Sequence, residues 1–121
     1  MDRFQALQNF WSSFGLKAYD ESTVPSNAKT PYITYSASTA GLNETVMLSA
    51  SLWYRSTSWS DASEKADEIN AEIGMNGNFI KFDDGVIWIV RGTPFAQRMS
   101  DEDDSIRRIY INVSAEFISA V

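Results

Sequence analysis

The stretch NFIKFDDGVIWIVR, which spans residues 78–91, is the part of the chain that predicts its own structure most directly. It contains Asp84-Gly85, a pair that tight hairpin turns favour because both central residues of such a turn take positive φ. The residues before and after the turn are mostly β-branched or aromatic, as they are in paired strands. The stretch therefore predicts an antiparallel β-hairpin over residues 78–91.

Both faces of this hairpin are apolar, whereas an antiparallel sheet with one wet face should alternate. The apolar residues are Phe79, Ile80, Phe82, Val86, Ile87, Trp88, Ile89 and Val90. Two covers are possible for the second face: the N-terminal segment of this chain, or another chain. Trp53 and Met47 likewise fall on the otherwise polar face of a predicted strand. Together these residues favour an oligomer.

Two helices are predicted from apolar residues that recur at steps of three and four. The first covers residues 2–14, and Gly15 follows where a left-handed C-terminal cap belongs. The second covers residues 58–73, with Ser58 as the candidate N-terminal cap. Its narrow apolar stripe consists of Ala62, Ala66, Ile69 and Ile73, and small residues of this kind allow a close approach to a sheet.

The remaining segments are predicted as strands and connections. Residues 32–55 form an antiparallel hairpin whose second strand alternates cleanly, and residues 106–118 form a long final strand. Residues 16–31 contain two prolines and are predicted to be extended with little regular structure. Residues 92–105 are predicted to form a polar loop. The predicted fold is thus α+β in one domain, residues 1–121, with two helices packed on a mostly antiparallel sheet in the order α-β-β-α-β-β-β.

Composition excludes several classes of function. The chain has 16 acidic and 10 basic residues, a net charge of −6, no histidine and no cysteine. A negative surface disfavours binding to nucleic-acid backbones and anionic membranes. Without histidine and cysteine, the Ser-His-Asp triad and the common zinc sites cannot be built. We therefore expect no enzymatic activity, no cofactor and no metal. The absence of cysteine fits a reducing compartment, and the N-terminus lacks a signal-peptide pattern.

The acidic run at residues 101–104 raises the question of a calcium site, but its spacing does not match an EF-hand loop, because Ile106 stands where glycine is required. A solvated loop tip is the plainer interpretation, and pairing with arginines of a neighbouring subunit is a third. Phe95 and Met99 in the predicted loop are either tucked beneath it or offered to a partner. The residues predicted to lie at an interface are Trp53, Arg55, Phe79, Trp88, Phe95, Arg98, Met99, Asp101, Asp103, Asp104, Arg107 and Arg108.

Several short stretches, together with the order of elements, resemble tail terminator or tail-to-head joining proteins of long-tailed bacteriophages, which are sometimes filed as minor capsid proteins. The similarity spans nearly the whole chain. Its stretches are PYITY (31–35), LWYRS (52–56), GTPFA (92–96), SDEDD (100–104) and IRR (106–108), the last followed by a long strand.

This resemblance implies an α+β subunit of the virion tail or neck, assembled in the host cytoplasm into a hexameric ring. Such a ring caps the head-proximal end of the tail tube, stops tube growth and docks to the neck of the capsid. The implied partners are further copies of the chain, the tail tube protein and a neck or head-completion protein, with DNA only passing through an acidic lumen. Two alternatives stay open: another neck or tail-tube subunit, or a small cytosolic module that binds a ligand or peptide in a pocket lined by Trp53, Trp59 and Trp88.

Overall fold

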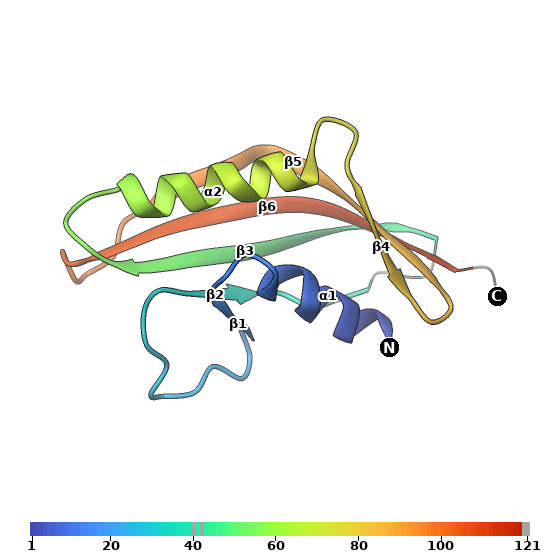
Figure 1. Cartoon of the computed structure of the whole chain (residues 1–121), viewed down its shortest axis with the longest axis horizontal. Coiled ribbons are helices and arrows are strands. Elements are labelled where there is room, and N and C mark those ends of the chain that lie inside the picture. Colours follow the sequence, from blue (N-terminus) through green and yellow to red (C-terminus); the bar gives the residue numbers. More distant parts are fainter. Residues whose placement is uncertain (40, 42, 120–121) are drawn as a thin grey trace.

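The structure is a computed structural model that describes residues 1–39, 41 and 43–119, so residues 40 and 42 of the loop inside the predicted hairpin lie outside it. The chain forms two helices and one six-stranded sheet (Figure 1). Their bounds are α1 Arg3–Ser12, β1 Lys17–Asp20, β2 Tyr32–Tyr35, β3 Thr45–Arg55, α2 Ser60–Ile73, β4 Asn78–Phe82, β5 Gly85–Met99 and β6 Ile106–Ser119. The predicted α+β class is confirmed.

The strands form one sheet in the order β1-β2-β3-β6-β5-β4. Every neighbouring pair is antiparallel except β1 and β2, which are parallel. The sheet therefore has six strands where five were predicted. The prediction missed β1 because this strand has only four residues and is held by pairing with β2, a tertiary contact that no local pattern reveals.

The predicted loop at residues 92–105 is also wrong in its first half, because β5 continues to Met99. Gly92 and Pro94 are ordinary loop signals, but here they fall at an irregularity in the β5–β6 register between Arg91 and Ala96. Such a bulge inserts residues into a strand without ending it. Gly92 is required at this point, because a Cβ there would lie 2.8 Å from the carbonyl oxygen of Asn112.

Both helices begin with local capping interactions that differ from the prediction at the second helix. The side chain of Asp2 caps α1 by accepting a hydrogen bond from the backbone nitrogen of Gln5. At α2 the N-cap residue is Trp59 rather than Ser58. Ser58 still helps the helix to begin, because its hydroxyl accepts a hydrogen bond from the backbone nitrogen of Ser60.

Both helices pack on the same face of the sheet, which we call the inner face. Helix α2 contacts the central strands β3, β6 and β5, and α1 contacts β1, β2 and β4. The alternating residues of β6 that point inward, Ile109, Ile111, Val113, Ala115 and Phe117, are all buried. Beneath α1, Phe10, Trp11 and Phe14 pack edge to face or tilted against one another. One continuous apolar core therefore lies between the helices and the sheet.

Helix α2 runs alongside the strands in the same direction as β6 (Figure 1). Its first turn lies beside the start of β6, where Trp59 contacts Arg107. Further along, Arg91 of β5 donates a hydrogen bond of 2.8 Å to Asn70. The molecule thus has two layers, helices over sheet, and no helix in the part of the chain that the structure describes covers the second face of the sheet. No helix within residues 1–39, 41 and 43–119 is long and apolar enough to cross a membrane.

Candidate assembly surfaces

The second face of the sheet, which we call the outer face, carries exposed aromatic side chains. Phe79 of β4 and Trp88 of β5 pair across the hairpin, and their rings stack at 5.9 Å with an interplanar angle of 9°. Phe79 is 60% exposed and Trp88 is 36% exposed. The indole nitrogen of Trp88 donates a hydrogen bond of 3.1 Å to the carbonyl oxygen of Asn76, which fixes the ring on the surface.

This arrangement rules out one of the two covers that the sequence left open for the hairpin. The N-terminal helix α1 does contact β4, but it packs on the inner face, where Ile87 and Ile89 are fully buried. It therefore does not cover Phe79 and Trp88. Met47 of β3 lies on the same outer face and is 59% exposed. We call Phe79, Trp88 and Met47 the apolar patch, in which Ser114 and Glu116 of β6 lie between Met47 and the stacked pair. Exposed apolar groups on an otherwise polar surface are candidate contact sites.

A second group of aromatic residues crosses the opposite end of the outer face. Tyr32 of β2 stacks on Trp53 of β3 at 6.2 Å, and Tyr19 meets Tyr32 edge to face at 5.9 Å. The guanidinium of Arg108 lies 4.6 Å from the centre of the Trp53 ring. We call Tyr19, Tyr32, Trp53 and Arg108 the aromatic ladder.

Polar contacts hold this ladder in place. The Trp53 indole nitrogen donates to the Thr34 hydroxyl at 2.9 Å, and Arg108 Nε donates to the Ser51 hydroxyl at 3.1 Å. A cation over the face of an aromatic ring is attracted by the ring quadrupole, by about 0.5–1 kcal/mol where the site is exposed. These contacts fix the Trp53 and Arg108 side chains on the surface of the isolated subunit.

Most of the other predicted interface residues gather around Trp59, a residue that the prediction did not include. Arg98 and Arg107 both lie over its ring, at 4.9 and 5.5 Å from the centre. A hollow of about 200 Å³ beside it is lined by Trp59, Met99, Ser100, Asp101, Asp103, Asp104, Ile106 and Arg107. We call this end of the molecule the tip. It combines α2, β5, β6 and the loop 100–105, which are distant in the sequence.

Charged groups at the tip are partly paired within the subunit. Arg55 lies 3.3 Å from Asp103, and it also donates a hydrogen bond of 2.6 Å to the Ser105 hydroxyl. Hydrogen bonds from the Ser105 hydroxyl and backbone to Asp103, assisted by Arg55, lower the pKa of the Asp103 carboxyl. Arg107 donates to the backbone oxygen of Asp104 at 2.6 Å. Arg55 and Asp103 thus already pair within one chain, and pairing of these arginines with the acids of a neighbour stays a prediction.

Phe95 stands apart from these groups. It is half-buried at the bulge of β5 and packs against the core, so it is tucked in rather than offered outward. Met99, also half-buried, ends β5 at the tip. Within the described residues, no group of three or more acidic side chains is placed to hold a metal ion, and this includes the acidic loop.

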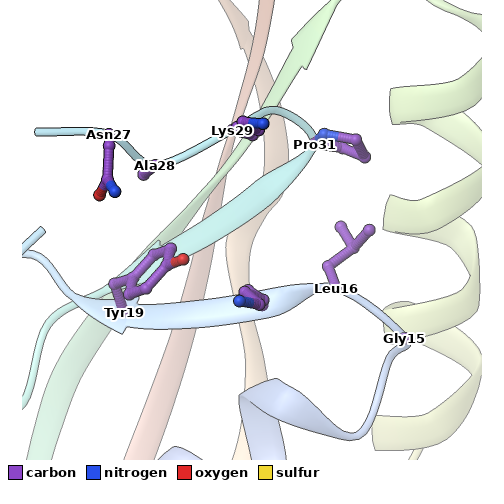
Figure 2. Close-up of a pocket in the computed structure, with 8 residues that line it drawn as sticks. Gly15, Leu16, Tyr19, Asn27, Ala28, Lys29 and Pro31 are labelled. Atoms are coloured by element: carbon purple, nitrogen blue, oxygen red, sulfur yellow. The ribbon is translucent and has the colours of Figure 1, made fainter. Parts of the chain in front are cut away.

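A separate hollow of about 600 Å³ lies between β1 and the loop that precedes β2 (Figure 2). Its lining comprises Gly15, Leu16, Lys17, Tyr19, Asn27, Ala28, Lys29 and Pro31. None of the three tryptophans that the binding-module alternative requires is among them. Trp53 and Trp88 instead lie on the outer face of the sheet.

Comparison with known proteins found a shared fold and no related protein of known activity. No protein-family model matches the chain, and no curated protein matches it. A chain from a solved structure described as "Virion of native gene transfer agent (GTA) particle" does match, with a TM-score of 0.59 and 18% sequence identity. The match covers 93% of this chain and 88% of that chain. The two chains therefore share a fold over nearly their whole lengths.

Proposed function

We propose that this chain is a structural subunit of a phage or phage-like particle, and specifically a tail terminator or tail-to-head joining protein. Copies of it assemble into a ring, of six subunits by the resemblance, at the head-proximal end of the tail tube. The ring stops growth of the tube and docks to a neck or head-completion protein. The chain thus belongs in the tail or neck of the virion after assembly in the host cytoplasm.

The observation that carries this proposal is the bare outer face with its stacked Phe79–Trp88 pair. An isolated subunit leaves these rings in water, and a subunit inside an assembly buries them. The fold shared with a chain of a gene transfer agent virion supports a structural role in a particle of the same general kind. A ring also fits the layered shape, because a head-to-tail ring needs two different surfaces on each subunit.

The charge of the chain supports passage of DNA rather than binding. The net charge is −6, with 16 acidic and 10 basic residues. DNA binding requires clustered cations that release counterions from the phosphates. Several of the arginines are instead engaged with aromatic rings of their own chain. A DNA duplex in the lumen of such a ring slides without sticking.

The proposal is tested by adding the purified chain to growing tail tubes of the same particle and imaging them by electron microscopy. A terminator produces tubes of limited length with the chain labelled at one end only. Incorporation along the tube identifies a tube subunit instead, and binding to capsids without binding to tubes identifies a connector. A chain that binds none of these and stays monomeric supports the small binding module.

A further inference from the structure

The exposed strip of α2 and the outer face of the sheet carry charges of mostly opposite sign, while Arg91, Arg98 and Arg107 lie between α2 and the strands on the helix side. On the outer face of the sheet, the strand residues include the cations Lys17, Lys81 and Arg108 and the anion Glu116. On the helix side, α2 exposes five acidic side chains, and its lysine is turned away. Lys65 is half-buried, donates to the backbone oxygen of Phe14 at 2.6 Å and pairs with Glu68 at 3.2 Å. The charged residues on the exposed strip of α2 are therefore all acidic.

The two sides also carry apolar groups at the same end. The apolar patch lies on the outer face near the β4–β5 hairpin. Helix α2 ends near this hairpin, where Ala71 is exposed and Met75, in the turn that follows the helix, is 85% exposed. The first turn of α2 lies at the other end, close to the tip and therefore to Arg108.

The lengths of the two surfaces agree. Glu116 of β6 lies opposite Trp88, and Arg108 of β6 lies opposite Trp53. These positions are eight residues apart, or about 26 Å at roughly 3.3 Å per strand residue. Helix α2 has 14 residues, or about 21 Å at 1.5 Å per residue. A helix seated with its C-terminal end on the apolar patch thus extends most of the way to the aromatic ladder.

We propose that the outer face of each subunit receives helix α2 of the next copy, parallel to its own α2. In this arrangement Ala71 and Met75 of one copy cover Phe79, Trp88 and Met47 of its neighbour. The acidic side chains near the start of the same helix approach Arg108. A second copy is the occupant that fits, because it brings both the complementary charge and the apolar end in the correct order. This inference rests on the proposed ring, and it names the two surfaces that build it.

The absence of cysteine from the chain makes disulfide cross-linking a clean test. We would prepare Ala71→Cys and Met47→Cys, both at exposed positions, separately and together in one chain, with Ser26→Cys in the exposed loop before β2 as the matched control. Under mild oxidation, a mixture of the first two variants is expected to give disulfide-linked dimers at least ten-fold faster than either gives with Ser26→Cys. The double variant is expected to give a ladder of multimers, since each subunit carries both halves of the contact.

Two results would overturn this inference. Rapid dimerisation of Met47→Cys alone means that outer faces meet each other, in a two-fold contact that builds no ring. Assembly into rings, seen by native mass, without cross-linking between positions 47 and 71 means that the ring uses other surfaces, and then the proposed function stands while this interface is wrong. If the wild-type chain assembles only on tail tubes, the same oxidation is carried out in their presence, and the same two results would overturn the inference.

Discussion

Replacing Phe79 by alanine separates assembly from folding, because the side chain is mostly exposed in the isolated subunit. An aromatic side chain has roughly 200 Å² to bury, and Phe79 is 60% exposed, so about 120 Å² remains for a partner to cover. At about 25 cal/mol per Å², this area corresponds to roughly 3 kcal/mol per contact. The association constant of each contact should therefore fall about 100-fold.

The folded subunit should lose less. The part of Phe79 already covered, about 80 Å², corresponds to at most about 2 kcal/mol of unfolding free energy. Small domains typically have about 5–15 kcal/mol in reserve, so Phe79→Ala should stay folded. Denaturant unfolding measures the free energy of unfolding of the variant, and sedimentation velocity over a range of concentrations measures its association.

The neighbouring residue supplies a matched control. Ile80 lies on the inner face of the same strand and packs against the core, so Ile80→Ala should cost about 2 kcal/mol or more of stability and leave association unchanged. The reasoning is refuted if Phe79→Ala assembles as well as the wild type, or if both variants weaken assembly in proportion to their loss of stability.

Three further predictions concern local features. Gly77→Ala should destabilise the subunit by more than the roughly 1 kcal/mol expected for Gly15→Ala. Both glycines have positive φ, but only at Gly77 would a Cβ meet backbone, 2.7 Å from the Ile89 carbonyl oxygen; equal thermal shifts would contradict this. Trp59→Ala should remove the ring contacts of Arg98 and Arg107 and lower the free energy of unfolding by about 1–2 kcal/mol. Trp59→Phe should restore part of this stability, and unchanged denaturation curves for both variants would show that these contacts do not stabilise the subunit. Because the folded-state pKa of Asp103 is lowered, its stabilising effect should be present above its ordinary pKa of 3.8 and be lost as pH falls through the folded value. A carboxyl NMR titration checks this, and Ser105→Ala should raise that pKa.

The hairpin and the exposed aromatic face were accessible from the sequence because both depend on local patterns. The Asp-Gly pair between two apolar runs indicated a tight turn, although in the structure the turn residues are Asp83 and Asp84, and Gly85 begins β5 without a positive φ. An apolar run that continues across both faces of a strand signals a second partner. Phe79 and Trp88 were identified on this ground, and the structure places them where water reaches them.

The parts that were missed depend on contacts between distant segments. Strand β1 exists through pairing with β2, and β5 continues past Pro94 because residues 96–99 pair again with β6. A side-chain hydrogen bond of 3.0 Å from Asn112 of β6 to the Pro94 carbonyl oxygen spans the irregularity. The role of Trp59 requires two arginines from different strands. The pair of Arg55 with Asp103 inside the subunit was not predicted, because charge spacing alone cannot tell an internal partner from an external one.

The most direct measurement of ring formation is the native mass of the purified chain, alone and with tail tubes of its particle, together with negative-stain images of the same samples. We predict closed rings, six-fold by the resemblance, either free in solution or seated at one end of the tube. A chain that remains monomeric in both samples, with tubes that grow to unrestricted length, would contradict the proposed function.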